Sequence, residues 1–219
     1  MKHSPIYGVA QIVGALGGIV TMAFHPTAHD LLAQADQIAR RNEMIAVATH
    51  SLALVSFPTL FFGFLGLSRR LGWDRPLVSA ALVSYGVGAV AVMCAVVFSG
   101  LVGPILTRQM LEADQSTKQL LHLVFSYNGQ LNQAFAKVFV VASSLAVILW
   151  SIALLSSGRF ALIIGFIGCI LGLISLAAFL SGHLRLDVHG FGLFVFGQSV
   201  WTILLGVFLC RSGDALPAG

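Results

Sequence analysis

Histidines gather around the ends of the apolar stretches, and histidine is both the commonest metal ligand and the side chain that titrates nearest neutrality. His25 and His29 stand four residues apart in the stretch FHPTAHD, and Glu43 and His50 stand seven apart. Each spacing places its two side chains on one face of a helix. If the two stretches meet, their nitrogen and oxygen atoms make a ligand set that suits zinc, copper or non-haem iron.

A connection late in the chain adds two more histidines to this set. His183 and His189 flank Asp187 in the polar segment 182–189. We therefore predict a site that holds a transition metal (zinc, copper or iron) or haem b, with the ligands His25, His29, Glu43, His50, His183 and His189. The chain has no HExxH, CxxCH or cysteine cluster, so spacing alone does not identify the metal. Two alternatives stay open: histidines that simply suit the headgroup region, and a proton relay.

A second polar feature lies in the stretch HLVFSYNGQLNQAFAK, residues 122–137. Spacings of four, four, three and four residues put its members on one helix face: His122, Ser126, Gln130, Gln133 and Lys137. We predict that this polar stripe binds a substrate, with Lys137 holding an anionic group. The alternative is a stripe that stands in water above the membrane or packs on the connections.

The elements that position these residues follow from composition. Of 219 residues 58% are hydrophobic and only 9% are charged, against about 25% charged residues in a soluble domain. A membrane crossing needs about 20 apolar residues, and six stretches qualify: 6–24, 44–67, 77–102, 138–155, 160–181 and 190–210. Their apolar runs are continuous rather than alternating, which argues against a β-barrel. The sequence predicts an all-α integral membrane protein with six transmembrane helices in a single domain, 1–219.

The basic residues of the short connections predict the orientation. With six crossings, one side holds Lys2, Arg69, Arg70, Arg75, Arg159 and Arg211. Lys and Arg prefer the cytoplasmic side of a membrane. We therefore predict an inner (plasma) membrane protein with both termini in the cytoplasm and the histidines at the outer face. The net charge of +4 then reflects topology, and no nucleic-acid partner is expected.

An internal repeat predicts how the helices are grouped. The triplet YGV at 7–9 recurs at 85–87, and ADQ at 35–37 recurs at 113–115, both at an offset of 78 residues. Repeat unit one covers 1–70 and repeat unit two 76–158, as parallel copies of a helical hairpin. Each copy carries a short amphipathic outer connection, 28–41 and 105–119. A third hairpin, 159–211, and a short polar tail, 212–219, complete the expected row of three hairpins.

These features favour one function and leave others open. We expect a multi-pass protein whose outer histidine site, periplasmic or extracellular, binds a metal or haem for redox or metal-assisted chemistry on a small or lipid-soluble substrate. A small transporter that uses the polar stripe and a non-catalytic subunit of a membrane complex are the alternatives. The expected partners are the lipid bilayer and either further copies of this chain or a larger membrane complex.

Overall fold

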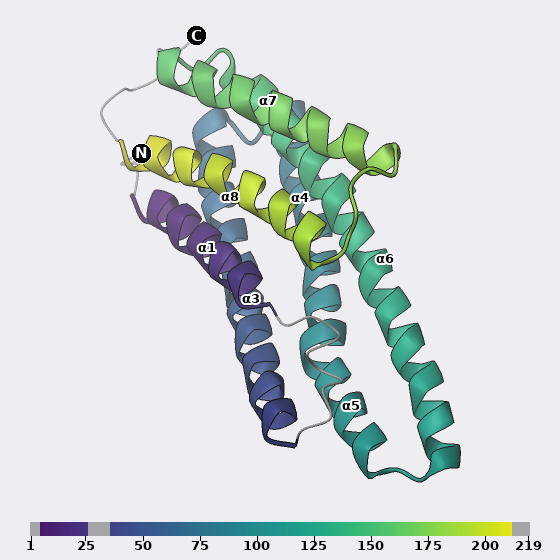
Figure 1. Cartoon of the computed structure of the whole chain (residues 1–219). Coiled ribbons are helices and arrows are strands. Elements are labelled where there is room, and N and C mark those ends of the chain that lie inside the picture. The colour runs from purple at the N-terminus through teal and green to yellow at the C-terminus, as the bar shows by residue number, and fades with distance from the viewer. Residues whose placement is uncertain (1–4, 26–35, 212–219) are drawn as a thin grey trace.

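The computed structural model of the chain is built from helices (Figure 1) and describes residues 5–25 and 36–211, with side chains described from 43 onward in the second range. Its elements are α1 (Ile6–Ala23), α3 (Asp36–Leu71), α4 (Pro76–Val97), the π-helix η1 (Phe98–Val102), α5 (Gly103–Glu112), α6 (Gln115–Leu154), α7 (Arg159–Leu180) and α8 (Val188–Cys210). Six helical stretches are long and apolar enough to cross a membrane. The prediction of an all-α chain with six such helices is confirmed.

Two helices are much longer than the apolar runs that predicted them. The run 138–155 is the last part of α6, which has 40 residues, and the run 44–67 lies within α3, which has 36. A helix of 40 residues is about 60 Å long, twice the thickness of a hydrocarbon core. The apolar run marks only the portion that suits hydrocarbon, because the helical hydrogen bonds continue through the polar turns beyond it.

The structure describes one of the two predicted amphipathic connections in full and the other only in part. The predicted connection 105–119 is helical: α5 follows α4 through the π-helix, and a short turn at Ala113 and Asp114 leads into α6. Asp114 caps α6, since its side chain accepts a hydrogen bond from the backbone N–H of Thr117 at 2.8 Å. Most of the connection 28–41 lies outside the described residues.

The helices surround a common centre. α1 packs along both α3 and α8, α4 packs along α6, and α6 packs along α7. Smaller contacts join α3 to α4 and α7 to α8. In Figure 1, α1, α7 and α8 lie together in the upper part of the view, while α3, α5 and α6 extend well beyond them.

One end of the bundle is held together by arginine side chains. Arg69 Nη1 donates to the Tyr7 hydroxyl at 2.7 Å, which joins the end of α3 to the start of α1. Arg70 Nη1 donates to the Phe208 carbonyl at 2.7 Å, and its guanidinium lies 3.9 Å from the centre of the Phe208 ring. We call this the arginine end, and the opposite end, where His25 and His50 lie, the histidine end.

Four aromatic side chains close the middle of the bundle toward the arginine end. We call Phe64, Tyr85, Trp150 and Trp201 the aromatic floor; each is at most 3% exposed. The Phe64 ring lies 4.5 Å from Trp150, nearly parallel to it, and 4.3 Å from Tyr85. The indole N–H of Trp150 donates to the Ser68 hydroxyl at 3.0 Å. Packing and this hydrogen bond fix the floor in one arrangement.

Glycines let the helices around the floor approach closely, and α1 and α7 each contain a GxxxG pair, Gly14 with Gly18 and Gly168 with Gly172. A Cβ added at Gly168 would overlap the side chains of Ser151 and Trp201, so α7 rests directly on α6 and α8. A Cβ at Gly14 would crowd Leu60 of α3. These two glycines are therefore required by packing rather than by backbone conformation.

Replacement of Ser68 by alanine should destabilise the protein. Ser68→Ala leaves the buried Trp150 N–H without its acceptor, which costs about 1–3 kcal/mol. Ser79→Ala is the control, because Ser79 is exposed and its hydroxyl bonds only to carbonyls of residues three and four positions earlier. Unfolding titrations in mixed micelles measure both variants, and equal stabilities would contradict the role given to Ser68.

Candidate functional site

A cavity of about 960 Å³ lies between the aromatic floor and the histidine end. Residues of α1, α3, α4, α6 and α8 line it, together with residues at the junction of α4 and α5. This volume is at the upper end of the range for small-molecule sites, which are mostly apolar with a few polar groups. The cavity therefore has the size and the central position of a ligand site.

The cavity is closed at one end. Phe64 and Tyr85 belong both to its lining and to the floor, and behind them Trp150 and Trp201 are fully buried. At the other end the lining includes exposed residues, His189 among them. The cavity thus opens at the histidine end and stops at the floor.

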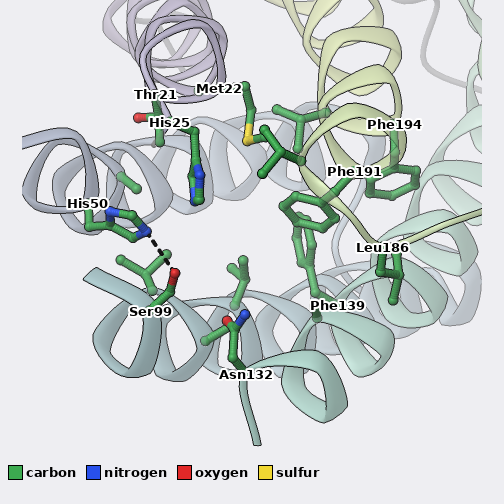
Figure 2. Close-up of a pocket in the computed structure, with 18 of the residues that line it drawn as sticks. Thr21, Met22, His25, His50, Ser99, Asn132, Phe139, Leu186, Phe191 and Phe194 are labelled. Carbon is green, nitrogen blue, oxygen red and sulfur yellow. Dashed lines mark hydrogen bonds between the residues drawn. The ribbon is translucent and has the colours of Figure 1, made fainter. Parts of the chain in front are cut away.

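His25 and His50 meet at the open end of this cavity, and we call them the histidine pair. Their ring centres lie 4.7 Å apart with the planes at 59°. His50 Nδ1 lies 2.7 Å from the Ala46 carbonyl oxygen, which can only accept, so Nδ1 carries the proton. In the neutral ring Nε2 then accepts from the Ser99 hydroxyl at 3.2 Å (Figure 2). Local hydrogen bonds therefore select one tautomer of His50.

The π-helix is what brings Ser99 to His50. A Cβ at Gly100 would overlap the His50 ring, so only glycine lets this backbone approach so closely. Asn128 of α6 supports the same turn, since its Nδ2 donates to the Phe98 carbonyl at 2.9 Å. Single π-helical turns are rare in proteins, and those that do occur are often found at functional sites.

Four of the five residues of the polar stripe line the cavity. They are Ser126, Gln130, Gln133 and Lys137. The fifth, His122, is exposed and lies outside the lining. Gln133 Nε2 also donates to the Leu186 carbonyl at 3.0 Å, which ties α6 to the connection between α7 and α8. The helical spacing thus predicted a cavity wall, and substrate binding by it stays a prediction.

The remaining predicted metal ligands are spread apart. Glu43 pairs with Arg108 of α5 at 3.7 Å and does not line the cavity. His183 is exposed, with Nδ1 2.8 Å from the Ser181 hydroxyl, and His29 lies outside the described residues. Among the residues that the structure describes, no three His, Cys, Asp or Glu side chains are placed to share a metal ion.

The start of α8 contributes His189 and Asp187 to the mouth of the cavity. The Asp187 carboxylate accepts from the Gly190 N–H at 2.8 Å and pairs with Arg185 at 3.1 Å. The Gly190 hydrogen bond above all, and then the charges of Arg185 and His189, hold the pKa of Asp187 below its usual value. Because this pKa is lowered, the cap is intact above the ordinary carboxyl range and is lost as the pH falls through the lowered value.

Other lining residues carried no signal in the sequence. Ser99 lies in the π-helix and Asn128 bonds to it, and no residue spacing in the sequence predicts a π-helical hydrogen-bond pattern. In Figure 2 the aromatic side chains Phe139, Phe191 and Phe194 lie across the cavity from the histidine pair. Aromatic residues in an apolar helix give no sign, in the sequence, of whether they face lipid or a cavity.

Alanine at Gly100 should displace the histidine pair. Gly100→Ala places a methyl group in the His50 ring, and overpacking of this kind costs about 1–3 kcal/mol. Gly129→Ala in α6 is the control: it meets no atom within 4 Å and should raise stability by about 0.5–1 kcal/mol. Unfolding titrations, together with the ring nitrogen NMR shifts of His50, report both effects; unchanged shifts in Gly100→Ala would refute the contact.

No protein-family model, curated protein or solved structure matches the chain. No relative therefore suggests a function for it. The cavity and the histidine pair are the features from which a function is inferred.

Proposed function

We propose that this protein binds a lipid-soluble or amphiphilic small molecule in the cavity, with the histidine pair facing the polar end of that molecule. The cavity is the observation that carries the proposal. It is about 960 Å³ in volume, has two aromatic residues of the floor in its lining, and has histidine, amide and lysine side chains at the histidine end. A mostly apolar chamber with a few convergent polar groups is the usual form of a small-molecule site.

The position of the cavity in the membrane supports this choice of ligand. His50 and Leu71 stand 21 residues apart in α3, about 31 Å along a helix and close to the thickness of a hydrocarbon core. We place the arginine end at the cytoplasmic boundary, as the preference of basic residues for that side suggests. The histidine pair then lies at the outer boundary and the aromatic part of the cavity at hydrocarbon depth, with both termini in the cytoplasm.

We further propose that the histidine pair can hold a transition metal ion. His50 donates Nδ1–H to a backbone carbonyl, which is how metal-binding histidines are usually oriented. Its Nε2 would have to exchange the Ser99 hydroxyl for the ion. Ring centres 4.7 Å apart fit two metal–nitrogen bonds of about 2 Å to one ion. Two imidazoles would leave coordination positions for water or substrate.

The same distance favours a metal ion over a haem. Two imidazoles on opposite faces of a haem iron, each bonded at about 2 Å, have ring centres about 6 Å apart. The rings of His25 and His50 are nearer to each other than that. The closed floor likewise favours a binding site or enzyme over an open pore, since a transporter would have to move the floor.

Filling the cavity should abolish ligand binding. A long-chain alcohol with a photoactivatable diazirine, used in lipid nanodiscs, should label cavity residues of the natural protein in a saturable way. Ala53→Phe places a ring in the lining and should reduce this labelling at least about tenfold. Val83→Phe, on an exposed position of α4, should leave it unchanged. Peptide mapping by mass spectrometry gives the result, and labelling confined to lipid-facing residues would refute the proposal.

Metal binding is tested separately. The purified protein, incubated with Co²⁺ and desalted, should retain about one ion per chain and show the absorption bands of a nitrogen-ligated site. His50→Gln should remove the ion, because it removes half of the histidine pair. His122→Gln should keep it, since His122 is exposed and lies outside the cavity. Equal retention by both variants would rule the pair out as the metal site.

A further inference from the structure

The two opposite charges that line the cavity are not paired with each other. Lys137 and Asp187 are the Lys, Arg, Asp or Glu residues in its described lining. The carboxylate of Asp187 is engaged by the Gly190 N–H and by Arg185. The two ion pairs in the described part of the chain, Arg185–Asp187 and Arg108–Glu43, do not include Lys137. Lys137 is therefore a cation whose counter-charge the lining does not supply.

Lys137 lies near the outer boundary of the proposed hydrocarbon core. Lys137 stands 17 residues before the end of α6 at Leu154, about 25 Å from the arginine end. This is just within a hydrocarbon core of about 30 Å. A lysine is costly at the bilayer centre, whereas near the boundary its stem can reach the interface; the side chain of Lys137 is exposed, so its ammonium group is accessible to an anionic partner.

Lys137 also borders the lipid-facing surface. A shallow apolar groove on the outside of α6 is lined by Lys137, Val138, Val141 and Ala142, with Phe179 of α7 opposite. Lys137 thus belongs to the part of α6 that separates the cavity from the bilayer. A lipid from the same leaflet would meet Lys137 as it entered.

The aromatic side chains and the depth of the cavity suit a hydrocarbon chain. Phe139 has ring contacts with Phe57 at 5.5 Å and with Phe194 at 6.0 Å, and all three line the cavity. His50 and Phe64, which mark its two ends on α3, are 14 residues or about 21 Å apart. One leaflet of a 30 Å core is about 15 Å deep, so a lipid chain fits this depth.

From this geometry we infer that the ligand is a single-chain amphiphile with an anionic head group. Lys137 holds the anion, with the amides of Gln130 and Gln133 beside it on the polar stripe, and the chain extends to the aromatic floor. The polar and apolar ends of such a ligand then lie at the same depths as in the surrounding outer leaflet, so it enters without turning over. This inference rests on the proposed function, because it requires that the cavity hold a ligand.

The experiment compares three diazirine probes with the same sixteen-carbon chain and different heads: a phosphate, a hydroxyl and a trimethylammonium group. With the natural protein in nanodiscs, the phosphate probe should reach half-maximal labelling of cavity residues at a concentration about tenfold lower than the alcohol, as expected for one charge-assisted hydrogen bond. The trimethylammonium probe should be weaker than the alcohol, because Lys137 repels a cation and the Asp187 carboxylate is already paired with Arg185.

Variants at two lysines of α6 assign the preference to one residue. Lys137→Gln should remove the tenfold advantage of the phosphate probe and leave the alcohol unchanged, while Lys137→Arg should keep the advantage. Lys118→Gln is the matched control, since Lys118 is exposed on the same helix outside the cavity. The unchanged alcohol labelling also shows that each variant is folded.

The outcomes separate the two proposals. If all three probes label the cavity equally in the natural protein, or if Lys137→Gln keeps the phosphate preference, the anionic head group is refuted and Lys137 merely reaches out to lipid head groups. Saturable cavity labelling by the alcohol would still support the proposed function in that case. If no probe labels the cavity in a saturable way, the proposed function itself fails.

Discussion

Hydrocarbon offers no hydrogen-bond partner, so polar groups at membrane depth must be satisfied within the protein. This constraint explains where the polar side chains of this chain lie. The indole N–H of Trp150 bonds to Ser68, and the ring nitrogens of His50 bond to Ala46 and Ser99. Gln11 is an exception: its side chain is fully buried, and its amide atoms have no hydrogen-bond partner among the described residues. Other polar side chains, among them Gln130, Asn132 and Lys137, line the cavity.

The aromatic floor and the polar mouth divide the cavity into two chemical environments. At the floor, aromatic rings pack closely against one another. At the mouth, histidine, amide and lysine side chains come from helices that are distant in sequence. The same arrangement that keeps polar atoms out of the hydrocarbon therefore prepares a site for a molecule that is itself part polar and part apolar.

The sequence predicted much of this fold because apolar runs depend on composition alone. It also predicted that Ser126, Gln130, Gln133 and Lys137 share a wall, since helical periodicity fixes a face. It did not predict the ends of α3 and α6, because hydrophobicity indicates which residues suit hydrocarbon and not where the helical hydrogen bonds begin and end. The contact of His25 with His50 was one of several hypotheses, as it depends on how α1 sits against α3. Ser99 was missed because no residue spacing in the sequence indicated the π-helical turn that places it beside His50.

The length of α6 has a practical consequence. A helix of 40 residues, about 60 Å long, exceeds the hydrocarbon core by about 30 Å. Like α3 and α5, it extends beyond the shorter helices α1, α7 and α8 (Figure 1). An antibody fragment raised against the turn between α5 and α6 would bind the protein outside the detergent belt. Its added mass would make the 23.2 kDa chain large enough to align in electron micrographs.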